Sequence, residues 1–178
     1  MTGPGNLRQQ MADGMVGLAQ FSPCGRYRYL LERQWNPATP LLIFVMLNPS
    51  TADEAALDPT VKRCLGRAIR NGFGRLRVFN LFAFRATHPA DLIAAAAPIG
   101  PDNDEALLQG VNDLQPDDRL VCAWGNHGRH LNRATEVTRA LRDLGVPLHH
   151  LGLTQQGAPR HPLYVPDERA LTLWQIPE

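Results

Sequence analysis

The sequence has few cysteines, a single lysine and no long apolar run. Cys24, Cys64 and Cys122 are the only cysteines among 178 residues, and no two are spaced as C-x-x-C. This argues against a disulfide framework and against a thiolate metal site. Lys62 is the only lysine, and the formal net charge is +1. A chain this close to neutrality has no overall field that would indicate a nucleic-acid or membrane partner.

The apolar content is that of a globular protein. Hydrophobic residues make up 44% and charged residues 20% of the sequence, which is too apolar for a disordered chain. The first residues contain no apolar signal segment, and no apolar run is long enough to cross a bilayer. We therefore expect a cytoplasmic protein without a membrane partner, while the oligomeric state stays unknown. We expect a loose lead-in over residues 1–20 and a single α/β domain over residues 21–178.

Apolar runs rich in β-branched and aromatic residues alternate with helical patterns along the chain. Strands are expected over residues 26–35, 41–47, 76–82, 119–124 and 146–151, the first two joined as a hairpin. Helices are expected over residues 58–72, 85–92, 101–114 and 127–144. This alternation predicts a three-layer α/β/α fold, with a central, mostly parallel sheet of about four strands and an added N-terminal hairpin strand.

Polar residues gather where the expected parallel strands end. In an open sheet of this kind the ligand crevice lies beyond the carboxyl ends of the strands, so four loops should meet at one rim. Core packing does not require polar residues there, whereas a binding or catalytic site does. The residues in question are Asn48, Pro49, Ser50, Thr51, Asp53, Arg85, Thr87, His88, Gly125, Asn126, His127, Arg160, His161 and Tyr164.

Several of these positions also have a structural interpretation. The N-P-S-T segment that begins at Asn48 can form a turn that only reverses the chain, although Asp53 and Asp58 add carboxylates nearby. Asn80 lies in an otherwise apolar strand, where its amide either bonds a neighbouring loop or presents a donor and an acceptor to a nucleobase edge. The two glycines of W-G-N-H-G, residues 124–128, allow close ligand approach or simply a tight turn.

The segment G-A-P-R-H-P-L-Y, residues 157–164, combines a cation, an imidazole and a phenol between two prolines. The prolines would hold the loop rigid, so His161 could stabilise a developing anion as a general acid or as a neutral donor. The alternative is a surface turn. Four other histidines suggest zinc, but no H-E-x-x-H motif or cysteine pair accompanies them. We therefore expect no metal and no cofactor.

Several ungapped motifs occur in fixed order between Phe21 and Pro166. They read F-S-P-C-G-R-Y-R-Y, M-L-N-P-S-T-A-D, L-D-P-T-V-K-R-C, V-F-N-L-F-A-F-R-A-T-H-P, G-P-D-N-D, A-W-G-N-H-G and G-A-P-R-H-P-L-Y. In this order they resemble the bacterial domain-of-unknown-function family 1643, DUF1643. That resemblance covers nearly the whole chain, and the family name implies no activity.

A more distant resemblance is to the uracil-DNA glycosylase superfamily. In that superfamily a buried strand ends in G-Q-D-P-Y or G-I-N-P-G, a later strand carries an Asn, another strand ends in W-G, and a closing loop reads H-P-S-P-L. This sequence has M-L-N-P-S, V-F-N-L-F-A-F-R-A-T, A-W-G and R-H-P-L-Y in the same order. The resemblance implies a uracil-DNA glycosylase-like fold, and a nucleic acid or nucleotide as partner.

The same resemblance implies roles for three residues. Asn48 would orient the attacking water, Asn80 would read the edge of a flipped base, and His161 would stabilise the departing base anion at its carbonyl oxygen. Since an amide cannot act as a general base, the water would be held by Asn48 and the backbone, or with help from Asp53 or Asp58.

Two features of that superfamily are missing. No serine follows the loop histidine to grip a phosphate, and Arg160 could replace that contact. No aromatic follows Asn48 to stack on the base, and Phe82 or Phe84 could serve instead.

The leading hypothesis is a glycosylase-like hydrolase that recognises a nucleobase and cleaves an N-glycosidic bond of a modified or damaged base. The alternatives are a non-catalytic nucleotide- or nucleic-acid-binding module, and a small-molecule hydrolase that uses Asp53 or Asp58 with His161. The expected catalytic residues are Asn48, Asp53 and His161. The expected substrate-binding residues are Pro49, Ser50, Thr51, Asp58, Asn80, Phe82, Arg85, His88, Gly125, His127, Arg160 and Tyr164.

Overall fold

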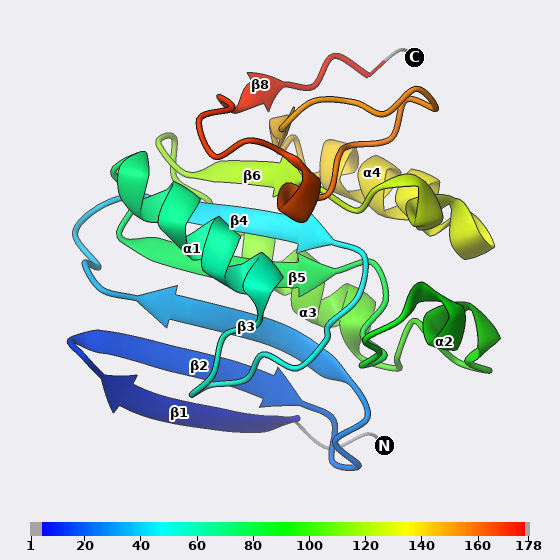
Figure 1. Cartoon of the computed structure of the whole chain (residues 1–178), viewed down its shortest axis with the longest axis horizontal. Helices are drawn as coiled ribbons and strands as arrows, with labels where there is room; N and C mark the ends of the chain where they lie inside the picture. The colour runs from blue at the N-terminus through cyan, green and yellow to red at the C-terminus, as the bar shows by residue number, and fades with distance from the viewer. Residues whose placement is uncertain (1–4, 177–178) are drawn as a thin grey trace.

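The computed structural model describes residues 5–176, in which eight strands form one mixed sheet (Figure 1). The strand order is β1-β2-β3-β5-β4-β6-β7-β8. The strands are β1 (Asn6–Ala12), β2 (Met15–Phe21), β3 (Arg28–Gln34), β4 (Leu41–Met46), β5 (Arg75–Asn80), β6 (Arg119–Cys122), β7 (Leu148–His150) and β8 (Thr172–Leu173). Parallel pairing is confined to β5-β4-β6-β7, and the other four of the seven strand pairings are antiparallel.

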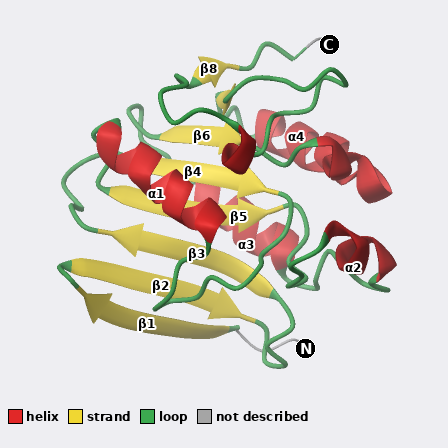
Figure 2. Cartoon of the chain, in the orientation of Figure 1, coloured by secondary structure: helices red, strands yellow, loops and turns green. Residues whose placement is uncertain are grey.

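The expected three-layer α/β/α sandwich around a mostly parallel sheet of about four strands is therefore wrong. The sheet has eight strands, most of its pairings are antiparallel, and few helices accompany it (Figure 2). The α-helices are α1 (Pro59–Arg70), α2 (Pro89–Ala94), α3 (Asn103–Val111) and α4 (Arg133–Asp143), with 3-10 helices η1 (Asn126–Asn132) and η2 (Pro162–Tyr164). Within residues 5–176 no helix has both the length and the apolar character needed to cross a membrane.

Residues 6–21, expected as part of a loose lead-in, form the hairpin β1-β2. Its two-residue turn consists of Asp13 and Gly14, both at positive φ, which is the geometry that suits a tight hairpin. Every residue of β1 is exposed, so the strand has no hydrophobic alternation by which the sequence could reveal it. Residues 1–4 of the expected lead-in lie outside the described part of the chain.

β3 and β4 do not form the expected hairpin, because β5 lies between them. β5 pairs antiparallel with β3 and parallel with β4. The connection between β3 and β4 closes over the start of β5, where the amides of Trp35 and Asn36 both donate to the Gly74 carbonyl at 3.0 Å. A Cβ at Gly74 would lie 1.9 Å from the Asn36 carbonyl oxygen, so only glycine permits this approach.

β4 is the most deeply buried strand of the sheet, with apolar side chains covered on both faces. Leu42, Phe44 and Met46 pack in one core cluster with α1, and Ile43 and Val45 pack in the other with α3 and α4. Each such side chain contributes on the order of 1.5–3 kcal/mol on burial. The resulting rigid strand carries the loop that begins at its carboxyl end.

α1 begins and ends where its capping residues predict. The Asp58 carboxylate accepts a hydrogen bond from the Val61 amide at 2.8 Å, Pro59 fills the first turn, and Asn71 caps the C-terminus. The helix expected over residues 127–144 is instead interrupted. Leu131 and Asn132 adopt positive φ and divide this segment into η1 and α4.

Candidate functional site

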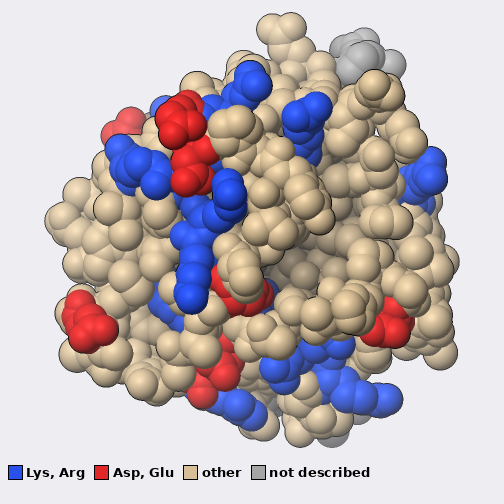
Figure 3. Space-filling view, in the orientation of Figure 1, with Lys and Arg blue, Asp and Glu red and all other residues tan. Residues whose placement is uncertain are grey.

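A cavity of about 900 Å³ lies at the carboxyl ends of β4 and β6, beside the N-terminus of α1. The space-filling view is hollowed at this place (Figure 3). Its walls come from the segments after β4, β5, β6 and β7 and from the first turn of α1. The three strands β4, β5 and β6 run parallel, so their following loops meet at one edge of the sheet.

The cavity brings together ten of the residues that the sequence places at the rim or predicts for the site. They are Asn48, Ser50, Asp58, Thr87, Gly125, Asn126, His127, Arg160, His161 and Tyr164. Seven others do not line it, namely Pro49, Thr51, Asp53, Asn80, Phe82, Arg85 and His88.

The residues outside the cavity have structural contacts of their own. The Asp53 carboxylate accepts hydrogen bonds from the Ala55 and Ala56 amides at 2.9 and 2.7 Å, so it holds a turn. Phe82 is fully buried, and the Arg85 guanidinium lies 5.0 Å from the centre of the Phe21 ring. These side chains support the loops around the cavity without facing it.

Pro49, Thr51 and His88 likewise lie beside the cavity rather than in its wall. The Pro49 carbonyl accepts the Ala86 amide at 2.9 Å, which joins the loop after β4 to the segment after β5. Thr51 is exposed, and His88 is exposed at the start of α2. A position near the end of a strand does not fix the direction of a side chain, so these three residues can lie beside the cavity without facing it.

Asn80 and Arg28 form a buried pair in which only Arg28 reaches the cavity. Asn80 is 2% exposed, and its Oδ1 accepts from Arg28 Nη2 at 3.4 Å. The Asn80 carbonyl accepts from Asn103 Nδ2 at 3.0 Å. The Asn80 Nδ2 is buried without a partner, and Asn80 does not line the cavity, whereas Arg28 does.

Arg28 is a buried cation with few partners. It is 2% exposed, and Nη1 donates to the Ala52 carbonyl at 2.8 Å. Within residues 5–176 no carboxylate lies within 4.0 Å of its guanidinium, and its Nε is buried without a partner. Burial lowers the pKa of Arg28 to about 10, against the opposing field of Asp58. A guanidinium has five N–H donors, so Arg28 retains several for a ligand.

Two other buried arginines are held more firmly, although the Nε of Arg67 is also buried without a partner. The Arg67 guanidinium donates to the carbonyls of Pro166, Asp167 and Arg169 and so fastens the C-terminal segment to α1. Arg133 forms an ion pair with Asp104. The sequence does not reveal Arg28 as a site residue, because the pattern of its strand does not distinguish a buried arginine from an exposed one.

Asn48 keeps one polar atom for a ligand. Its Nδ2 donates to the Pro49 and Ala86 carbonyls at 3.0 and 2.8 Å, which fixes the orientation of the amide. No donor from the described residues reaches its Oδ1. This oxygen is therefore available to accept a hydrogen bond from water or substrate.

Asp58 is the carboxylate of the cavity. One oxygen caps α1 through the Val61 amide, and the other has no hydrogen-bond partner among the described residues. Since Asp53 faces its own turn, Asp58 is the acidic group that can act on a molecule in the cavity.

His161 is held in one tautomer. Its Nδ1 accepts from the Leu163 amide at 3.4 Å, so the proton of the neutral ring is on Nε2. Burial lowers the pKa of His161 against the opposing charge of Asp58, and the ring is neutral near pH 7. The exposed Tyr164 ring lies 5.8 Å from the imidazole, centre to centre, at the rim.

Among residues 5–176, no group of three His, Cys, Asp or Glu side chains is arranged to hold a metal ion. The charged and polar side chains of the cavity are instead two arginines (Arg28 and Arg160), one carboxylate (Asp58), two histidines (His127 and His161) and a set of amides and hydroxyls. Thr154, Gln155 and Gln156 also line the cavity, and they lie in a loop without a distinctive motif by which the sequence could reveal them.

Comparison with known proteins gives one match. The model of the family described as "Protein of unknown function (DUF1643)" matches residues 28–163. No curated protein and no solved structure matches the chain. The more distant resemblance to the uracil-DNA glycosylase superfamily is not confirmed. The matched segment spans more than half of the chain and runs from Arg28 past His161, so this protein belongs to the DUF1643 family.

Proposed function

We propose that this protein is a hydrolase that takes a nucleobase into the cavity and cleaves the N-glycosidic bond of a modified or damaged base. The observation that carries the proposal is the convergence of three complementary groups in one cavity. They are the free Oδ1 of Asn48, the free carboxylate oxygen of Asp58 and the Nε2–H of neutral His161.

Asn48 and Asp58 suit the activation of water. The Asn48 Oδ1 can accept one hydrogen bond from a water molecule, and the Asp58 carboxylate can accept a second and withdraw its proton. An amide alone orients water but takes no proton, so the carboxylate supplies the basicity. This assigns to Asp58 the role that the sequence left open between Asp53 and Asp58.

His161 and Arg28 suit the departing base. Breaking an N-glycosidic bond leaves negative charge on the base, and the His161 Nε2–H can donate to the base oxygen that receives it. The Arg28 guanidinium adds a positive charge in a buried environment, where screening by water is weak. Both groups bind the product anion better than the neutral substrate, which is the condition for catalysis.

The remaining walls suit recognition of a base. A volume of about 900 Å³ accommodates a nucleoside-sized ligand. Tyr164 offers an exposed ring at the rim on which a base can stack, and the amides of Gln155 and Gln156 can pair with its polar edge. We propose that Tyr164 stacks on the base, the role first considered for Phe82, and that Gln155 and Gln156 read its edge, the role first considered for Asn80.

The proposal is tested by incubating the protein with DNA that contains uracil, other deaminated bases or bulky modified bases, followed by detection of abasic sites. We expect wild type to release at least one of these bases. Asn48→Ala and His161→Ala should lose most of this activity, and the control His88→Ala should keep the wild-type activity. His88 is a matched control because it is exposed and lies outside the cavity. Equal activity of wild type and His161→Ala would contradict the proposal.

A non-catalytic nucleotide-binding module is the second candidate. The unsaturated donors of Arg28 favour it, because they suit a bound anion whether or not a bond is broken. Nucleotide binding that Arg28→Met abolishes, with no base released by wild type from any substrate, would select this candidate.

A further inference from the structure

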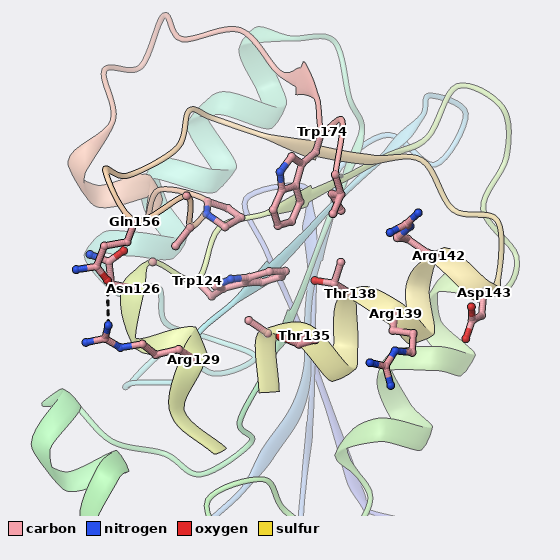
Figure 4. Close-up of a pocket in the computed structure, with 16 residues that line it drawn as sticks. Trp124, Asn126, Arg129, Thr135, Thr138, Arg139, Arg142, Asp143, Gln156 and Trp174 are labelled. Carbon is pink, nitrogen blue, oxygen red and sulfur yellow. Dashed lines mark hydrogen bonds between the residues drawn. The ribbon is translucent and has the colours of Figure 1, made fainter. Parts of the chain in front are cut away.

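A second cavity, of about 770 Å³, lies between α4, the loop over residues 154–159 and the C-terminal segment (Figure 4). It shares Trp124, Gly125, Asn126 and Gln156 with the first cavity, so the two cavities adjoin at these residues. None of the residues assigned above to the chemistry lines it.

Two indole rings form the apolar part of the second cavity. Trp124 and Trp174 are 5.9 Å apart between ring centres, with their planes inclined by 58°. Trp174 comes from the C-terminal segment and is only half-buried, so part of its ring is accessible (Figure 4). Trp124 is only 2% exposed and supports Trp174 from below, so Trp174 is the ring that offers a stacking surface to a flat ligand.

The charged part of the second cavity is mainly positive. Arg129, Arg139 and Arg142 line it together with one carboxylate, Asp143. Arg139 and Arg142 are three residues apart on α4, so their like charges are neighbours on the helix surface. Neither has an ion-pair partner among residues 5–176, and Arg129 donates to Gln156 Oε1 at 3.1 Å. This excess of positive charge would attract an anion to the edge of the second cavity.

We propose that the second cavity binds the nucleotide next to the one whose base enters the first cavity, so that the ligand is single-stranded nucleic acid. Stacking rings beside unpaired arginines match the base and the phosphate of a nucleotide. Because the two cavities share residues 124–126 in their walls, neighbouring nucleotides of one strand can occupy them. A single strand fits because the bases of a duplex are already paired and stacked. The inference rests on the proposed function for the identity of the ligand.

The test measures binding without turnover, by fluorescence anisotropy of a labelled single-stranded deoxythymidine octamer. We expect Trp174→Leu to weaken binding by about tenfold, the loss typical of one stacked base. Arg139→Gln combined with Arg142→Gln should also weaken binding and reduce its salt dependence. The control is Arg169→Gln, which removes an exposed arginine that lines neither cavity.

Three results would overturn the inference: octamer binding that is unchanged in both variants, duplex binding as tight as single-strand binding, or no binding by wild type. Thermal unfolding of each variant checks that the fold is retained. If the octamer binds wild type, the variants weaken that binding as expected, and no base is ever released, the second cavity is upheld as a nucleotide site and the hydrolase is rejected. If Trp174→Leu and the double arginine variant both keep wild-type base release at saturating and at limiting substrate, the hydrolase is upheld and the nucleotide site in the second cavity is rejected.

Discussion

At the scale of the single residue, the three cysteines differ sharply in environment. Cys24 is exposed, its thiol lies 3.3 Å from the Ser22 hydroxyl, and hydrogen bonds from Ser22 and Arg26 lower its pKa to about 7. Cys64 and Cys122 are buried, and burial raises the pKa of both thiols. Only the thiolate is a strong nucleophile, so the three should react at very different rates.

We predict that iodoacetamide modifies Cys24 of the native protein and spares the other two cysteines. The rate should rise with pH and reach half its maximum near pH 7, because the thiolate fraction follows the pKa. Peptide mass spectrometry measures the sites, and Ser22→Ala should slow the reaction at neutral pH. Modification of Cys64 or Cys122 at a comparable rate would show that the core around them opens more readily than the structure indicates.

Residue types in loops were more predictable than the directions of their side chains. Asn48, Asp58 and His161 were expected in the loops that form the site, and all three line one cavity. Asp53 in a loop and Asn80 in a strand were also expected to face the site, but Asp53 holds a turn and the Asn80 side chain bonds buried Arg28. A side chain's direction depends on hydrogen-bond partners from distant segments, which a single sequence does not reveal.

At the scale of the secondary-structure element, two glycines inside helices give opposite expectations. A Cβ at Gly66 of α1 would meet only the flexible Arg70 side chain, at 3.4 Å, whereas a Cβ at Gly110 of α3 would lie 2.1 Å from the Phe79 ring. Gly66→Ala should raise the free energy of unfolding by about 0.5–1 kcal/mol through helix propensity. Gly110→Ala should lower it by roughly 1–3 kcal/mol, because the overlap outweighs that gain.

Urea unfolding followed by circular dichroism measures both values, and each variant is the control for the other. The same backbone change is made in both helices, so a difference in sign reports packing alone. Stabilisation by Gly110→Ala would mean that α3 lies farther from β5 than the structure places it.

Elements with strong local patterns were predictable, and their pairing was not. The buried run of β4 and the Asp58 cap of α1 lie where the sequence indicated. The fully exposed β1 has no apolar pattern, and the break at Leu131 and Asn132 has no glycine or proline to announce it. The insertion of β5 between β3 and β4 depends on contacts between distant segments, so the direction of the sheet's strands was predicted wrongly.

At the scale of the whole molecule, three partly buried histidines make stability depend on pH. Burial lowers the pKa of His149, His150 and His161 below the ordinary value of 6.5. The unfolded chain therefore binds more protons than the native one just below pH 6.5, and stability rises with pH through that window. On acidification stability is lost from about pH 6.5 downward, before most carboxylates titrate.

We predict a decrease in the free energy of unfolding between pH 7 and about pH 5, measured by urea denaturation at a series of pH values. Replacing a contributing histidine, as in His149→Gln, should flatten this dependence, because one source of differential proton binding is removed. His88→Gln, which changes an exposed ring, serves as the control. A pH dependence as steep in His149→Gln as in wild type would contradict this origin of the effect.

The central claim is that an N-glycosidic bond is hydrolysed in the first cavity. This claim gives Asp58 a role in the reaction and gives none to Asp53, although the two aspartates are close in sequence. Asp58→Asn keeps an acceptor at the N-cap of α1, and Asp53→Asn keeps an acceptor in its turn, so neither replacement should disrupt the fold. Only Asp58 lines the cavity. Both variants remove one negative charge from the same region, but only Asp58→Asn removes the proposed general base.

The most direct measurement is the single-turnover rate of base release by wild type and by these two variants. We predict that Asp58→Asn lowers the rate at least about 100-fold, the usual contribution of a general base, while Asp53→Asn keeps the wild-type rate. Wild-type activity in Asp58→Asn, an equal loss in both variants, or the absence of any release by wild type would contradict the claim.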